Sequence, residues 1–259
     1  MNNQKQIVKF VKNLKKDLDF LENLKTNQIK KFNSKKKGSV DPVTKLDLKV
    51  ERLIRLRINQ KFSDHSIIGE EFDDKINKSQ YKWIIDPIDG TKNLIMGLPT
   101  WSNLLGLYKG KNSILSFANF PVLKKYYIAY GKKTFIYENN IYKKIYSNKR
   151  ANYKNAKIAI NTFHTIKEKK VFNFLKKYKG FYKITGSDAY NFCLIAEGKI
   201  DVLIESGLKK VDILPIISII ENSGAIISDW AGKMNFENGD VLVSANSNLH
   251  KHFLKKIRR

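Results

Sequence analysis

The sequence predicts an α/β fold whose N-terminal half is α+β in character. Three observations indicate this class: apolar residues recur every three or four positions in the first 60 residues, short β-rich runs follow one another between 81 and 137, and strand and helix patterns alternate after about 150. No linker rich in proline or glycine separates the halves. We therefore expect two sub-domains in one continuous body, an N-terminal one at 1–149 and a C-terminal one at 150–259, with a cleft between them as the natural place for a site.

The N-terminal half begins with two amphipathic helices. One covers 4–24, and a second apolar pattern begins at Thr44. Thr44 and Asp47 lie three residues apart, as in an N-terminal capping box, so a purely structural role explains both residues. Between the helices, 30–39 is lysine-rich and poor in apolar residues, so we expect a mobile loop whose 35–37 lysine run is a solvated charge run.

The remaining helices and strands are predicted from changes in the spacing of apolar residues along the chain. Runs rich in β-branched and aromatic residues predict strands in the first half at 83–85, 104–108, 114–118, 126–130 and 134–137. In the second half the patterns predict strands at 157–160, 200–204, 225–228 and 241–244, and helices at 167–178, 188–196 and 211–222. The first half is therefore expected to form a sheet, and the second half an α/β unit.

Composition excludes several classes of protein. With 259 residues, of which 42% are hydrophobic, the chain is long enough to bury its own core. The one cysteine, Cys193, excludes an internal disulfide framework and fits a reducing compartment. No apolar segment has the length of a signal peptide or a membrane span. We expect a soluble cytoplasmic protein without a membrane partner.

The charge is strongly positive. Lys and Arg number 49 against 24 Asp and Glu, a net charge of +25 that attracts phosphate esters, nucleic acids and other anions. The basic residues are spread over the whole chain, and no aromatic RNA-binding signature, zinc knuckle or GXXG loop is present. The charge is therefore better explained by overall composition than by a face specific for nucleic acid.

Carboxylates are scarce, so the places where they gather are informative. They gather at three points: Glu70 with Glu71, Asp86 with Asp89, and Asp212. Asp86 follows a buried strand, and a rigid proline separates it from Asp89, so two carboxylates and an intervening carbonyl are directed at one spot. Such oxygen ligands suit Mg²⁺, whereas Cys and His are too few for zinc. An isolated pair at this spacing often only caps a turn.

Gly90 and Thr91 follow these aspartates. They supply unhindered backbone N–H groups at the start of a helical turn over 92–95, which is a suitable place for a phosphate oxygen. A cation and a phosphate would therefore meet at the end of one strand.

The full string at 86–91, Asp-Pro-Ile-Asp-Gly-Thr, resembles the inositol monophosphatase family of lithium-sensitive, magnesium-dependent phosphatases. The likeness continues at 41–47 (D-x-V-T-x-x-D), at 69–71 (G-E-E), and at Asp212 with 223–225 (W-D and A-G-G). Val211 departs from the family, which commonly has an aromatic residue there. The resemblance implies a layered αβαβα sandwich of the inositol monophosphatase and fructose-1,6-bisphosphatase type, and a homodimer or larger assembly.

The resemblance also implies two to three Mg²⁺ ions. The first would be bound by Glu70, Asp86 and the Ile88 carbonyl. The second would be bound by Asp86, Asp89 and Asp212, and a third, weaker ion by Glu70 and waters.

The same resemblance assigns the catalytic residues. Glu70 and the Thr91 hydroxyl, itself hydrogen-bonded to Asp47, would orient the water that attacks phosphorus in line, so no phosphoenzyme is required. Gly90 and Thr91 would contact the phosphate. The expected reaction is hydrolysis of a small phosphate monoester.

Within the family, 89–101, 186–190 and the stretch from Glu205 to 230 most resemble the histidinol-phosphatase branch. Histidinol phosphate carries an ammonium and an imidazole, so extra carboxylates near the leaving group, Asp188 and Glu205, favour it. Alternatively, Asp188 caps a helix and Glu205 ends a strand in water. The alternative functions are an inositol-1-monophosphatase or a broader sugar or nucleotide phosphatase, and a non-catalytic nucleic-acid-binding protein.

Overall fold

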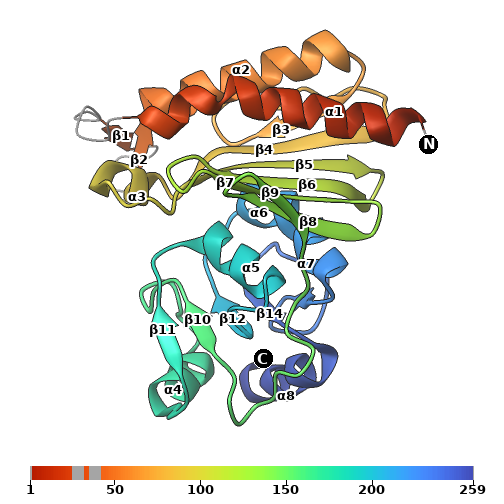
Figure 1. Cartoon of the computed structure of the whole chain (residues 1–259). Helices are drawn as coiled ribbons and strands as arrows, with labels where there is room; N and C mark the ends of the chain where they lie inside the picture. Colours follow the sequence, from red (N-terminus) through yellow and green to blue (C-terminus); the bar gives the residue numbers. More distant parts are fainter. Residues whose placement is uncertain (1, 25–31, 35–41, 259) are drawn as a thin grey trace.

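The computed structural model describes residues 2–24, 32–34 and 42–258, which form alternating layers of helix and sheet (Figure 1). Helices cover the outer face of each of two sheets, and a third group of helices lies between the sheets. The outer helices are α1 (Asn2–Asp17) and α2 (Lys45–Lys61) on one side, and α4 (Lys169–Lys177) and α8 (Ser247–Ile257) on the other. This arrangement confirms the predicted αβαβα sandwich.

The first sheet has seven strands in sequence order, and only its β3–β4 pair is parallel. Its strands are β3 (Ser66–Gly69), β4 (Tyr81–Asp89), β5 (Ser102–Lys109), β6 (Asn112–Phe120), β7 (Lys125–Tyr130), β8 (Lys133–Glu138) and β9 (Ile141–Lys144). A short antiparallel pair, β1 (Phe32–Ser34) with β2 (Pro42–Thr44), lies apart from it. This sheet thus takes its strands from the first half alone.

The second sheet has five strands in the order β11-β10-β12-β14-β13. They are β10 (Ile158–Ile160), β11 (Tyr182–Ile184), β12 (Val202–Glu205), β13 (Ile226–Ser228) and β14 (Val241–Ser244). The helices between the sheets are α5 (Asp188–Ala196), α6 (Lys210–Ile213), the 3₁₀ turn η3 (Leu214–Ile216) and α7 (Ile217–Ser223). The boundary at 149/150 falls between the two sheets, and its meaning as a sub-domain boundary stays a prediction.

Strand β4 shows how the layers share one body. Because successive side chains of a strand point to opposite faces, Trp83 and Ile85 pack with α1 and α2, whereas Ile84 packs on the other face against Val211 of α6. Val211 is 9% exposed. The valine that departs from the family pattern is therefore a packing contact between the sheet and α6.

Two predicted helices are interrupted. The segment 4–24 is α1 followed by a 3₁₀ turn, η1 (Asp19–Asn23), and its apolar spacing persists because Leu18 and Leu21 are still buried. The helix predicted at 211–222 is divided into α6, η3 and α7, and Pro215, which has no N–H to donate, lies at the break. None of the helices in the described ranges has the length and apolar character needed to cross a membrane.

Other elements were not predicted. The loop expected at 30–39 contains β1, while its remaining residues, including 35–37, lie outside the described residues. Strands β3, β9 and β11 were also missed; the last two are sheet-edge strands whose side chains are mostly exposed, so they lack an alternating pattern. Helix α8 did carry a signal, since Leu249 and Phe253 are buried four residues apart and the Asn246 side chain accepts from the Leu249 N–H at 2.9 Å.

His250 of α8 gives the fold a dependence on pH. The ring is 7% exposed, its Nε2 lies 3.0 Å from Ser228 Oγ, and burial lowers its pKa from 6.5 to about 4. In the unfolded chain His250 therefore binds a proton as the pH falls through 6.5. In the folded chain it stays neutral until the pH falls to about 4. Through this residue we expect the free energy of unfolding to fall by about 2 kcal/mol between roughly pH 7 and pH 5.

Urea unfolding of the wild-type chain and of His250→Asn at the two pH values measures this loss as the difference between the two chains. The variant should lack the contribution of about 2 kcal/mol, and His252→Asn on the same helix is the control. An equal pH dependence in the wild-type chain and in His250→Asn contradicts the assignment.

Candidate active site

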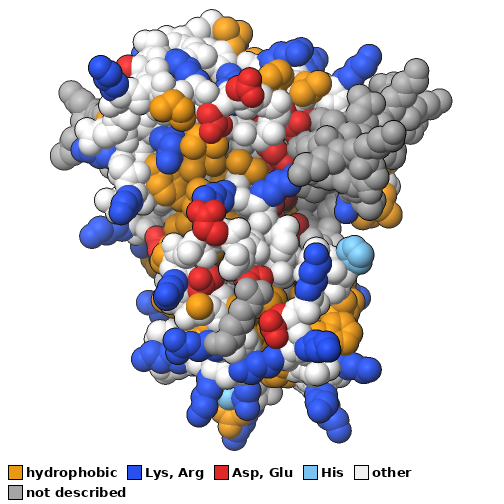
Figure 2. Space-filling view, turned by 180° about the vertical axis from the view of Figure 1, so that it is seen from behind, with side chains coloured by type: hydrophobic (Ala, Val, Ile, Leu, Met, Phe, Trp, Pro, Cys, Tyr) orange, Lys and Arg blue, Asp and Glu red, His pale blue; other side chains and the backbone are white. Residues whose placement is uncertain are grey.

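A pocket of about 660 Å³ brings together residues from both halves of the chain. The first half contributes Glu70, Asp86, residues 88–93 and Met96, and the second contributes residues near 161–165, 186–188 and 206–212. Five of the side chains that line the pocket are carboxylates, Glu70, Asp86, Asp89, Asp188 and Asp212. On the face drawn in Figure 2, acidic side chains lie among many Lys and Arg side chains. The predicted cleft between the halves is thus present and acidic.

The end of β4 places two aspartates in this pocket. In a regular strand, residues three apart point to opposite faces, but the pairing of β4 with β5 shifts register between Asp86 and Asp89. Asp86 Oδ1 accepts from the Ile88 N–H at 3.0 Å, and Asn103 Nδ2 donates to the Pro87 carbonyl at 2.7 Å. The irregular strand end therefore directs Asp86, Ile88 and Asp89 into one pocket.

Glu70 is positioned by a buried ion pair that the sequence analysis missed. Glu51 of α2 is fully buried; its Oε1 accepts from Arg55 Nε at 2.7 Å, and its Oε2 accepts from the Glu71 N–H at 2.8 Å. Arg55 also donates to the Phe72 carbonyl at 2.9 Å. The spacing of Glu51 and Arg55, four residues apart on a helix, was the available signal.

The pocket carboxylates repel one another. Burial raises the pKa of Asp86 well above its usual range, and repulsion from Glu70, Asp89 and Asp212 adds to it. Burial and Asp188 raise the pKa of Asp89 to about 8, and burial and Asp89 raise that of Asp212 to about 7. A divalent cation among these groups would reverse the effect.

Thr91 stands at the start of α3 (Thr91–Met96), after Gly90, whose φ of 79° is left-handed. Its hydroxyl oxygen lies 3.1 Å from Asp47 Oδ1 and from the Ile88 carbonyl oxygen. Asp47 also accepts from the Thr44 N–H at 2.8 Å, which completes the capping box of α2. Asp47 is buried outside the pocket, so it acts on the pocket only through Thr91.

Asp188 and Glu205 occupy different positions. Asp188 lines the pocket and accepts from Asn161 Nδ2 at 2.6 Å, while Ser187 is the N-cap of α5. Glu205 is 1% exposed, accepts from the Asn161 N–H, and contacts Asp188. The alternative that Glu205 ends its strand in water is therefore wrong. Glu205 lies behind Asp188, so a direct contact between Glu205 and a ligand would need a rearrangement.

Two lysines, Lys92 and Lys209, line the acidic pocket. Lys209 Nζ lies 2.9 Å from Glu70 Oε1, and both residues line the pocket. Among the described residues, no three His, Cys, Asp or Glu side chains form a closed cage for a metal ion. The carboxylates share a pocket without converging on one point.

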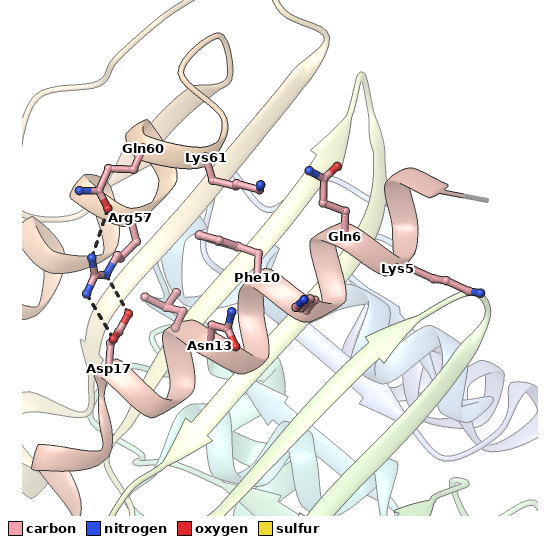
Figure 3. Close-up of a pocket in the computed structure, with 10 residues that line it drawn as sticks. Lys5, Gln6, Phe10, Asn13, Asp17, Arg57, Gln60 and Lys61 are labelled. Atoms are coloured by element: carbon pink, nitrogen blue, oxygen red, sulfur yellow. Dashed lines mark hydrogen bonds and ion pairs between the residues drawn. The ribbon is translucent and has the colours of Figure 1, made fainter.

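A second pocket, of about 640 Å³, lies between α1 and α2 (Figure 3). The acidic residue in its lining, Asp17, accepts from Arg57 Nε at 2.8 Å, and Arg57 also donates to Gln60. The charge of Asp17 is thus already balanced by Arg57, and this second pocket lacks the carboxylate cluster of the first.

The model of the inositol monophosphatase family matches residues 3–259. The chain belongs to this family. The bifunctional phosphatase IMPL2 of Arabidopsis thaliana is 32% identical over 246 residues, which are 88% of this chain and 68% of that protein. A histidinol-phosphatase of Chlorobaculum parvum is 29% identical, covering 83% of each chain. A fructose-1,6-bisphosphatase/inositol-1-monophosphatase of Aquifex aeolicus is 30% identical, covering 90% of this chain and 88% of its own.

Solved structures of the inositol monophosphatase fold agree. The SuhB protein of Bartonella henselae superposes with a TM-score of 0.84 at 18% identity, covering 98% of this chain and 99% of its own. An IMPase/NADP phosphatase solved with Mg²⁺ and phosphate gives 0.82 at 22% identity, covering 98% and 95%. These likenesses establish the fold of this family member.

Proposed function

We propose that this protein is a Mg²⁺-dependent phosphate monoester hydrolase that converts L-histidinol phosphate and water to L-histidinol and phosphate in histidine biosynthesis. The supporting observation is that Glu70, Asp86, Asp89 and Asp212, from separate segments, line one pocket. Mg²⁺ keeps several of its waters and needs few protein ligands, so open carboxylates suit it without a closed cage.

The residues divide between two main ions. Glu70, Asp86 and the Ile88 carbonyl would hold the first, and Asp86, Asp89 and Asp212 the second, with a third, weaker ion at Glu70. Bound Mg²⁺ supplies neutralisation of phosphate charge and a water of lowered pKa. The raised pKa values of Asp89 and Asp212 agree with a site whose charges are balanced by cations.

The protein's own groups position the reactants. Glu70 and the Thr91 hydroxyl orient the attacking water, and Asp47 fixes Thr91 through the 3.1 Å contact. The Gly90 and Thr91 backbone N–H groups face the phosphate. The water oxygen bonds to phosphorus as the bond between phosphorus and the alcohol oxygen on the opposite side breaks. One of the two water protons ends on the leaving alcohol, and the other stays with the phosphate product.

The choice of histidinol phosphate rests on Asp188. A carboxylate in the pocket wall, held by Asn161, is suited to pair with the substrate ammonium. Glu205 supports Asp188 from behind. The similarity to the Chlorobaculum parvum histidinol-phosphatase agrees with this choice.

A phosphate-release panel tests the proposal. We expect kcat/KM for histidinol phosphate to exceed that for inositol 1-phosphate, fructose 1,6-bisphosphate and phosphoadenosine phosphate by at least about tenfold. Asp188→Asn should raise KM for histidinol phosphate about tenfold and leave that for inositol phosphate nearly unchanged, because only the first substrate loses an ion pair. Glu237→Gln, at an exposed carboxylate outside the pocket, is the control. A clear preference for inositol phosphate contradicts the substrate, and absence of Mg²⁺-dependent release contradicts the enzyme.

A second candidate is an inositol monophosphatase or a broader phosphatase of the same fold, which the Aquifex aeolicus relative favours. The nucleic-acid-binding alternative predicts RNA affinity that falls steeply with salt and no phosphatase activity. The homodimeric or larger assembly and the cytoplasmic location stay predictions.

A further inference from the structure

Lys209, one of two lysines that line the pocket, joins the two halves of the chain at a carboxylate. Lys209 precedes α6, and Glu70 follows β3, 139 residues away in the sequence. Their side chains are 47% and 13% exposed, and Lys209 Nζ lies 2.9 Å from Glu70 Oε1. A half-exposed ammonium therefore lies on a carboxylate whose chain neighbour, Glu71, is hydrogen-bonded through its backbone N–H to Glu51.

Lys209 also lies beside Asp212. Its backbone N–H donates to Asp212 Oδ2 at 2.7 Å, and its positive charge acts to lower the pKa of that carboxyl. The ammonium thus supplies positive charge to an acidic group of each half of the pocket.

We propose that the Lys209 ammonium competes with Mg²⁺ for Glu70 and, once displaced, binds the phosphate group in the same pocket. This inference rests on the proposed function. The side chain is long and half-exposed, so it can leave Glu70 without disturbing α6. An anion entering the pocket offers the displaced ammonium a new partner, so Mg²⁺ and phosphate bind with positive coupling.

Calorimetry of the full chain with Mg²⁺ alone measures the competition directly. Because a part-exposed ion pair is a weak competitor, Lys209→Met should bind Mg²⁺ about 3- to 10-fold more tightly than the wild-type chain. In saturating Mg²⁺, its affinity for inorganic phosphate should fall about 3- to 10-fold. Lys209→Arg, which keeps the charge, should bind Mg²⁺ more weakly than Lys209→Met.

The neighbouring residue offers a matched control. Lys210 is 52% exposed, pairs with Glu237 and does not line the pocket, so Lys210→Met removes the same charge without the contact. Its Mg²⁺ affinity should stay within about twofold of the wild-type value. Thermal melting of each variant verifies that it is folded.

Three results overturn the inference. The first is Mg²⁺ binding by Lys209→Met that is no tighter than wild type. The second is an equal gain in Mg²⁺ affinity in Lys209→Met and Lys210→Met, which would reflect only the loss of one positive charge from the chain. The third is phosphate affinity unchanged by Lys209→Met. If the wild-type chain and all variants fail to bind Mg²⁺, the proposed function itself is wrong, and this inference falls with it.

Discussion

Asp86→Asn is expected to lower turnover by at least about a hundredfold at saturating Mg²⁺, which is the scale of one lost electrostatic stabiliser. Asp86 is the one carboxylate assigned to both main ions, and it is 2% exposed. An amide keeps its shape and can still accept from the Ile88 N–H, but it contributes no negative charge. Steady-state phosphate release with histidinol phosphate measures the effect.

The same substitution separates catalysis from folding. Because Asp86 is repelled by Glu70, Asp89 and Asp212, its removal should leave the melting temperature in EDTA at least as high as that of the wild-type chain. Asp64→Asn, at a side chain that is 76% exposed, is the control and should retain activity. Near-normal turnover of Asp86→Asn contradicts the metal assignment.

Gly106→Ala is expected to lower the free energy of unfolding. A Cβ at Gly106 of β5 would lie 2.7 Å from Pro215 Cα and 3.4 Å from the Leu214 carbonyl oxygen, so backbone must move. Overpacking of this kind costs about 1–3 kcal/mol. For a chain of this size it corresponds to a drop in melting temperature of roughly 2–12 °C. Since η3 directly follows α6, activity should fall as well through displacement of Asp212.

Gly110→Ala provides the comparison. Nothing lies within 4 Å of its added methyl group, so this variant carries only the strain of a left-handed φ of 58°. Scanning calorimetry should show a smaller drop than for Gly106→Ala. A melting temperature of Gly106→Ala within about 1 °C of wild type contradicts the close packing of η3 on the sheet.

The parts of the fold and of the site that could be predicted are those that depend on short-range patterns in the sequence. The capping box of Thr44 and Asp47 and the strand leading to Asp86 depend on neighbours in sequence. The edge strands β9 and β11 were missed because their mostly exposed side chains show no alternation. Likewise, Pro215 interrupts an apolar run that otherwise has helical spacing.

The sequence by itself determined the fold class, the scarcity of carboxylates against a charge of +25, and the string from Asp86 to Thr91, since each is a property of residue type and local spacing. Only the tertiary structure decided which distant groups meet. It placed Lys209 on Glu70, Glu51 and Arg55 beneath the loop that carries Glu70, and Glu205 behind Asp188. Such contacts join residues that lie far apart in the sequence, so they depend on how the layers of helix and sheet pack. The local spacing of apolar residues does not determine that packing.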